Sequence, residues 1–144
     1  MGTTVLVPID DSDPAWNALD YAIDHHGRDS IVVVHVLDPT GLTTYTGMEG
    51  NMVTDFEDIH EHRRDAGKAL LERAYERANA TGVTVETEIL TGRPAGAIVE
   101  CASDEAVDHI VIGSHGRTGV GRVLLGSVAE TVIRRSPVPV TVVH

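Results

Sequence analysis

Five runs of apolar, mostly β-branched residues are separated by longer stretches in which apolar residues recur three or four positions apart. The first pattern is typical of β-strands and the second of amphipathic helices. The predicted strands are Thr4–Ile9, Ile31–Leu37, Val83–Ile89, His109–Gly113 and Val138–Val143. The predicted helices are Pro14–His26, Asp55–Thr81, Gly92–Glu105 and Ser127–Arg135.

Alternation of strands with helices predicts an α/β fold, because parallel neighbouring strands need a crossover connection. The length of 144 residues suits one domain, residues 1–144, built as a doubly wound open sheet with helices on both faces. Ligands of such sheets bind beyond the carboxyl ends of the strands, where the strand order reverses. We therefore expect Asp10, after the first strand, to lie beside Gly113, at the end of the fourth.

Local signals predict where the helices begin and end. Asp13 is expected to cap the first helix, with Pro14 at its first position and Gly27 at its end. The apolar face of the long second helix is expected to comprise Ala66, Leu70, Ala74 and Ala78. Residues Thr40–Thr54 carry three glycines and no clear periodicity, and we interpret them as a loop or flexible lid.

The segment between the fourth and fifth strands is rich in glycine. Gly116, Gly119 and Gly121 lie in its loop, and Gly126-Ser127 opens the last helix. Glycine adopts positive φ and lets the backbone approach a ligand closely, while the free N–H groups of a helix start favour negative charge. The pattern predicts a phosphate site.

The charge balance is strongly acidic, with 22 Asp and Glu against 11 Lys and Arg, of which Lys68 is the single lysine. Such a surface resembles that of proteins from salt-loving organisms, where excess negative charge maintains solubility. A formal net charge of −11 argues against nucleic acid as a general partner. Neither a membrane span nor a signal peptide is evident, so we expect a cytoplasmic protein with no membrane partner.

Other candidate chemistry is limited. The single Cys101 excludes an internal disulfide and is expected to be a small buried residue. His60 and His62 flank Glu61, but residues two apart point to different sides of a helix, so we favour a solvated acidic face and expect no metal site. His35, within an apolar strand, is expected to be a hydrogen-bonded core residue. No GxxxxGK[ST] motif is present, which excludes a Walker-type NTPase.

Five ordered segments resemble the universal stress protein family, and specifically its ATP-binding branch. They are VLVPIDDS, VVHVLDP, the GxP of Gly92-Arg93-Pro94, IVIGSHGRTG, and LLGSVAETVIRRSPVPVTVV at the end. The spacing of Gly113, Gly116, Gly126 and Ser127 is similar to the family's nucleotide-binding motif. The resemblance covers essentially the whole chain and implies five parallel strands in the order 3-2-1-4-5, usually in a homodimer.

The resemblance also implies a binding site for ATP, or for AMP or ADP, with Mg²⁺ or Mn²⁺ as a possible companion. In it Asp10 contacts the ribose, the backbone of Val36 holds the adenine, and backbone groups of the glycine loop and last helix surround the phosphates, with the Ser127 hydroxyl as an additional donor. The expected site residues are Pro8, Ile9, Asp10, Val36, Ile112, Gly113, Ser114, His115, Gly116, Arg117, Gly126, Ser127 and Val128. Arg122 is a further candidate for the phosphates.

Three functions remain open from the sequence. The favoured one is a nucleotide-responsive binding module that signals to an unknown downstream protein. The second is a slow ATPase or phosphotransferase that uses the same pocket; hydrolysis needs a base or water-orienting group, and Asp10 is the one obvious candidate. The third is a ligand-free interaction module that dimerises through Val138–Val143, a strand whose apolar pattern would pair with its own copy at the sheet edge.

Overall fold

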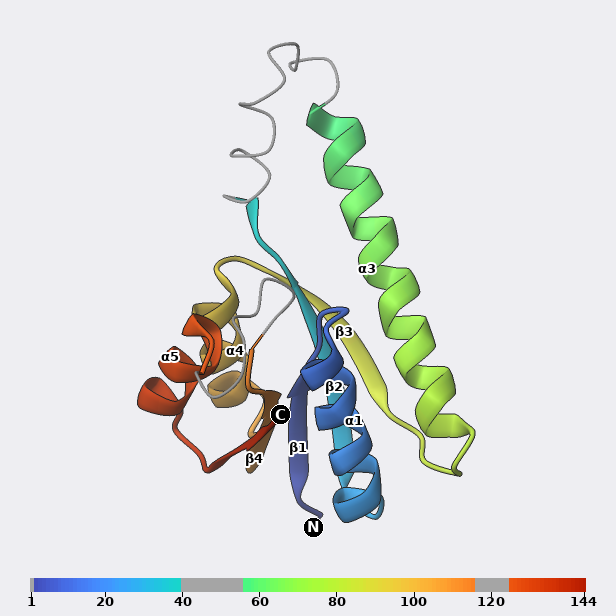
Figure 1. Cartoon of the computed structure of the whole chain (residues 1–144), viewed down its shortest axis with the longest axis vertical. Helices are drawn as coiled ribbons and strands as arrows, with labels where there is room; N and C mark the ends of the chain where they lie inside the picture. The colour runs from blue at the N-terminus through green and yellow to red at the C-terminus, as the bar shows by residue number, and fades with distance from the viewer. Residues whose placement is uncertain (1, 40–55, 116–124) are drawn as a thin grey trace.

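The computed structural model describes residues 2–39, 56–115 and 125–144. They form a five-stranded parallel sheet in the order β3-β2-β1-β4-β5, which confirms the expected α/β architecture and strand order (Figure 1). The strands are β1 (Thr4–Pro8), β2 (Ser30–Leu37), β3 (Glu86–Thr91), β4 (His109–Gly113) and β5 (Val140–Val143). The strand order reverses between β1 and β4, and β5 is an edge strand.

Helices cover both faces of this sheet (Figure 1). On one face lie α1 (Asp13–His26) and α3 (Phe56–Asn79), and on the other α4 (Pro94–Asp104) and α5 (Ser127–Arg135). Successive strand residues point to opposite faces, so Val5 and Val7 pack under α1 and α3 while Leu6 packs under α4 and α5. Covering both faces explains why β1 and β2 are almost continuously apolar.

Two predicted strands begin later than their apolar residues suggested. Val83 belongs to the turn that closes α3, because its N–H donates to the carbonyl of Ala78 and Gly82 before it has a φ of +87°. Val138 belongs to a turn in which its N–H donates to the Ser136 hydroxyl. Side-chain alternation alone does not reveal such turns, since they are defined by hydrogen bonds of backbone N–H groups.

The helix boundaries also required correction. Ser12, and not Asp13, caps α1, because its hydroxyl accepts the N–H of Ala15 at 3.3 Å. The predicted start of α3 at Asp55 lies outside the described residues, and α3 ends at Asn79 instead of Thr81. Gly27 follows the last residue of α1, as expected.

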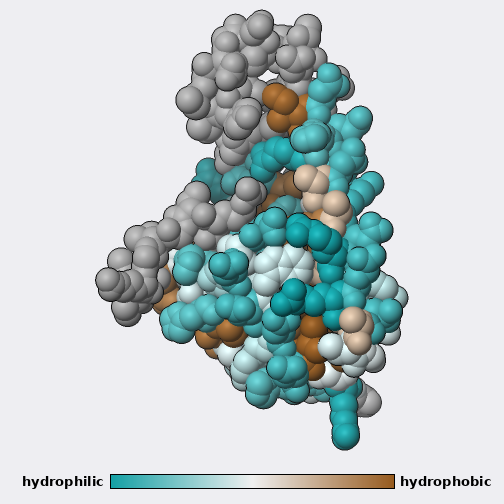
Figure 2. Space-filling model, turned by 45° about the vertical axis from the view of Figure 1, so that its right-hand side comes forward, coloured by the Kyte–Doolittle hydropathy of each residue, from teal (hydrophilic) through white to brown (hydrophobic). Residues whose placement is uncertain are grey.

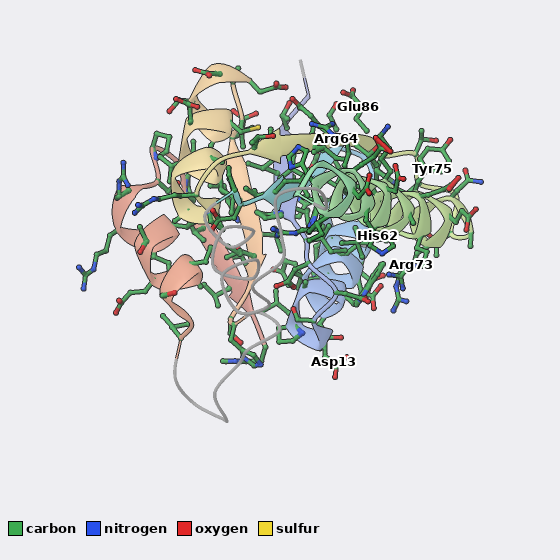
Figure 3. All side chains as sticks on the ribbon, turned by 90° about the horizontal axis from the view of Figure 1, so that it is seen from above. Asp13, His62, Arg64, Arg73, Tyr75 and Glu86 are labelled. Carbon is green, nitrogen blue, oxygen red and sulfur yellow. The ribbon has the colours of Figure 1, made fainter. Side chains whose placement is uncertain are left out.

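The buried face of α3 includes three of the four expected residues, Leu70, Ala74 and Ala78. The fourth, Ala66, is exposed, and Gly67 and Leu71 are buried in addition. The other sides of the helix are polar, and the surface in Figure 2 is mainly hydrophilic with small, separate apolar patches. Tyr75 projects outward from α3, whereas Arg73 of the same helix lies over the Trp16 ring of α1 and pairs with Asp11 (Figure 3).

Helices α1 and α3 are also joined at their surface. Arg77 donates two hydrogen bonds to Asp20, at 2.7 and 2.8 Å, and its guanidinium lies 5.4 Å from the ring centre of Trp16. Paired contacts of this geometry fix orientation more than they stabilise, because both partners remain partly exposed. No helix within the described ranges is both long and apolar enough to cross a membrane.

The sheet core sets the stability of the fold. Ile110 of β4 is fully buried, whereas Ile133 of α5 is 41% exposed. We expect Ile110→Ala to lower the free energy of unfolding by about 2–5 kcal/mol and Ile133→Ala by less than about 1 kcal/mol. Urea denaturation followed by circular dichroism checks this. Equal losses in the two variants would contradict the core described above.

Candidate functional site

A cavity of about 570 Å³ opens at the carboxyl ends of β1, β2 and β4, where the strand order reverses. Its walls come from these strand ends, from the start of α1, and from the first residues of α4 and α5. The described lining residues are Pro8, Ile9, Asp10, Ala15, Val34, His35, Val36, Pro94, Ile98, Ile112, Gly113, His115, Leu125, Gly126, Ser127, Val128 and Ala129. This is the location at which doubly wound sheets bind ligands.

Asp10 is the only carboxylate among the described lining residues. One oxygen of its side chain, Oδ1, accepts the backbone N–H of Ser12 at 3.1 Å and also the Ser12 hydroxyl. The same hydroxyl oxygen caps α1 and lies 3.5 Å from the carbonyl of His115. Ser12 therefore orients the Asp10 carboxylate and lies between the β1 and β4 ends of the cavity.

Gly113 has no side chain because α1 approaches too closely. A Cβ atom there would lie 2.8 Å from the carbonyl carbon of Pro14 and 2.9 Å from the nitrogen of Ala15. Those are backbone atoms and cannot move aside cheaply. The glycine at the end of β4 thus lets the start of α1 come against the cavity.

Gly126 also lies too close to neighbouring backbone for a side chain to fit without a shift, in this case to His115. Its N–H donates to the carbonyl of Ser114 at 2.7 Å, and a Cβ atom would lie 3.0 Å from the Cα of His115. Its φ of −71° is accessible to any residue, and among the described glycines only Gly82 and Gly92 have positive φ. Of the two properties expected of glycine in this segment, positive φ and close approach of the backbone, Gly113 and Gly126 use the second.

The two sides of the cavity differ in polarity. Val34 and Val36 of β2, with Pro94 and Ile98 of α4, form an apolar wall. The start of α5, including Ser127 and Val128, supplies backbone N–H groups that have no partner inside the helix. No Lys or Arg occurs among the described lining residues. An apolar ring against the β2 wall and an anion near α5 would suit this division.

Most of the sequence-predicted site residues are brought together by the fold. Those that line the cavity are Pro8, Ile9, Asp10, Val36, Ile112, Gly113, His115, Gly126, Ser127 and Val128. Asp10 and Gly113 share this cavity, as expected from the switch point. Gly116, Arg117 and Arg122, together with the predicted lid, lie outside the described residues.

Ser114 is close to the cavity but does not line it. It is 1% exposed, and its hydroxyl lies 3.2 Å from Nδ1 of His115. Its N–H donates to the carbonyl of Val143 and its own carbonyl accepts the N–H of Gly126, both at 2.7 Å. Ser114 is thus a buried link between the end of β5 and the start of α5.

Sequence reasoning missed several lining residues. These are Ala15, Val34, His35, Pro94, Ile98, Leu125 and Ala129. Pro94 lies in the Gly92-Arg93-Pro94 segment, which was a usable signal. His35 is hydrogen-bonded, as predicted, but it is half-buried and borders the cavity, so its expected place in the core is only partly correct.

Cys101 is buried, as predicted, with 6% of its surface exposed. Burial raises the pKa of its thiol to about 11, and the nearby carboxylates of Glu105, Glu88 and Asp104 contribute to this increase. Burial also raises the pKa of Glu88, with Glu105 and Glu86 adding to the effect. The thiol is therefore protonated at neutral pH, in keeping with a packing role.

The whole chain, residues 1–144, matches the model of the universal stress protein family. The chain belongs to this family. It is 36% identical over 141 residues to universal stress protein MJ0531 of Methanocaldococcus jannaschii, a match that covers 96% of this chain and 80% of that protein.

Solved structures of the family have the same fold. The structure of MJ0577 from the same organism superimposes with a TM-score of 0.84 at 30% identity, covering 99% of this chain and 96% of that one. A universal stress protein from Archaeoglobus fulgidus, solved in complex with dAMP, gives a TM-score of 0.66 at 27% identity and covers 100% of this chain and 98% of that one. A family member with this fold thus holds an adenine nucleotide.

Proposed function

We propose that this protein binds an adenine nucleotide, ATP foremost, in the cavity at the carboxyl ends of β1, β2 and β4. The observation that carries the proposal is the union, in one cavity, of an apolar β2–α4 wall, the oriented Asp10 carboxylate and the start of α5. The dAMP complex of the A. fulgidus relative supports the same class of ligand. ADP or AMP would use the same features with fewer phosphate contacts.

Each part of the nucleotide has a candidate partner. The adenine lies against the apolar wall and is held by the backbone of Val36, while Asp10 accepts a ribose hydroxyl. The phosphates lie at the start of α5, beside Gly126, where Ser127 and Val128 offer backbone N–H groups and Ser127 also offers its hydroxyl. Ile112, Gly113 and His115 line the cavity near this position. The family resemblance adds the backbone of Gly116 and Arg117 to the proposed phosphate contacts. Mg²⁺ or Mn²⁺ accompanies the phosphates.

Backbone donors suit a protein of this charge. The net charge of −11 repels a polyanion at long range, whereas hydrogen bonds from amides act at contact distance. At 1 M salt the Debye length falls to ~3 Å, so the repulsion fades while the contacts persist. We therefore propose that binding strengthens, or at least holds, as salt increases.

Binding without efficient turnover is the favoured activity, with the nucleotide acting as a signal to a downstream protein. A slow ATPase or phosphotransferase is the second candidate, because Asp10 places a carboxylate in the cavity. Its Oδ1 is already engaged by Ser12, and the ribose role competes for the rest of the group. Hydrolysis also needs a positioned water and a metal.

We further propose a homodimer formed through β5, in the cytoplasm of a salt-adapted cell. The edge position of β5 and its Val140 and Val142 side chains, which are only partly buried, support pairing with a second copy. The acidic composition and the single lysine support the salt adaptation. A ligand-free dimeric interaction module would share this interface.

Nucleotide binding is tested by calorimetry with ATP, ADP and AMP, with and without Mg²⁺. Gly126→Val should weaken ATP binding by more than about tenfold, because its side chain meets the His115 backbone and crowds the phosphate position. Gly2→Val is the matched control, since a Cβ at Gly2 has open space around it. Unchanged affinity in Gly126→Val would remove α5 from the site.

The ADP released over an hour by purified protein with Mg²⁺ and ATP distinguishes the binding module from the slow ATPase. Many turnovers would favour the enzyme.

Dimerisation is tested at the edge of β5 with Val142→Pro. Pro139 and Val143 accept hydrogen bonds from β4, so the N–H of Val142 faces the open edge, where proline is tolerated within the fold. The variant should be a folded monomer by light scattering and circular dichroism, whereas the unmodified protein is a dimer. A folded variant that stays dimeric would refute this interface.

The salt dependence of stability is tested by thermal unfolding in about 0.1 M and about 2 M KCl. The midpoint should rise with salt, because screening relieves the repulsion among acidic groups. Replacing the exposed Glu72 and Glu76 with Gln should reduce that rise. Equal midpoints at the two salt concentrations would contradict the salt-adapted reading.

A further inference from the structure

Ile9, the residue between β1 and Asp10, is fastened to β2 at both of its backbone polar groups. Its N–H donates to the carbonyl of Val34 at 2.8 Å, and its carbonyl lies 2.8 Å from Nδ1 of His35. Because a carbonyl oxygen can only accept, Nδ1 carries the proton and the imidazole is the donor. His35 therefore ties β2 to the segment that presents Asp10 to the cavity.

This imidazole has room only because α3 carries a glycine beside it. A Cβ atom at Gly67 would lie 2.9 Å from Cδ2 of His35 and 3.6 Å from its Nε2, and Gly67 is buried. Glycine in the interior of a helix is unfavourable relative to alanine. The close approach of the ring gives a physical reason for accepting that cost in the middle of α3.

Other contacts of the Asp10 segment do not fix it relative to β2 in this way. Ser12 binds Asp10 and caps α1, so it orders the segment internally and against the start of α1. Within the described parts of the chain, two hydrogen bonds join this segment to β2: Ile9 donates to the Val34 carbonyl, and His35 donates to the Ile9 carbonyl. Val36 of the same strand forms part of the opposite wall. The Val34 bond continues the β1–β2 pairing, and the His35 bond is the contact that a side chain makes to the same residue. The separation of Asp10 from Val36 thus depends on both bonds.

We propose that His35 is a positioning residue for the nucleotide site, and that α3 controls its position through Gly67. The imidazole holds Ile9 and thereby sets the distance from the Asp10 carboxylate to the β2 wall. A side chain at position 67 pushes the ring away from the Ile9 carbonyl, and the ribose and adenine contacts lose their spacing. The inference rests on the proposed nucleotide binding at this cavity.

The test compares four variants of the full-length protein with ATP as the probe. Gly67→Ala and His35→Leu should each weaken ATP binding by about tenfold or more, since each breaks the bond to Ile9. His35→Asn keeps an N–H donor near the position of Nδ1 and should stay within about threefold of the unmodified affinity. Gly96→Ala is the matched control, because it adds the same methyl group within α4 where nothing lies within 4 Å.

Coupling between the two positions gives a second criterion. If Gly67→Ala acts through the His35 bond, the double variant with His35→Leu should lose no more affinity than the larger single loss. Additive losses would overturn the proposed route from α3 to the site. Circular dichroism and thermal unfolding establish that each variant is folded.

Amide hydrogen exchange of the ligand-free protein separates this inference from the proposed function. The N–H of Ser12, which is bonded to Asp10, should exchange faster in Gly67→Ala and His35→Leu than in Gly96→Ala or the unmodified protein. If the unmodified protein binds no adenine nucleotide, the proposed function fails and exchange alone decides whether His35 holds the Asp10 segment. Unchanged exchange, or unchanged ATP affinity in a protein that binds ATP, would overturn the role of His35.

Discussion

The cavity depends on backbone segments coming closer together than side chains would permit. At Gly113 the end of β4 touches the backbone of Pro14 and Ala15, and at Gly126 the start of α5 touches the backbone of His115. Because both contacts involve main-chain atoms, any added side chain must displace a segment instead of turning aside. The hydrogen bond from Gly126 to Ser114 then closes the wall at 2.7 Å. The polar groups around the cavity gain their positions from these two contacts.

The α/β class follows from the apolar pattern of the sequence, whereas the strand order and most of the expected cavity lining came from the family resemblance. Continuous apolar runs such as Val5–Val7 require cover on both faces, and this requirement together with the family resemblance specifies the sheet. The pattern does not specify which residue of an element contacts a segment that is distant in the sequence. Ser12 replaced Asp13 as the cap, and Gly67 replaced Ala66 on the buried face, because those choices depend on contacts with distant segments. His35 was missed as a lining residue for the same reason.

The cavity lining contrasts with the acidic composition of the chain. Acidic residues outnumber basic ones along the chain, while the described cavity wall contains one carboxylate and neither Lys nor Arg. Recognition of an anion in such a cavity depends mainly on shape, on backbone amides and on the Ser127 hydroxyl. Those donors do not titrate and keep their strength when surface charges are screened. The arrangement would suit the nucleotide binding at high salt that is proposed above.

The peptide groups of Ser114 have a mechanical consequence. The N–H of this residue is held by the last residue of β5 and its carbonyl by the first turn of α5, and the side chain is sealed from water. Two backbone hydrogen bonds in series therefore connect Gly126, at the cavity wall, to Val143, at the end of the edge strand β5. Any movement of the start of α5 that keeps both bonds would also shift the end of β5, the strand proposed to pair with a second copy.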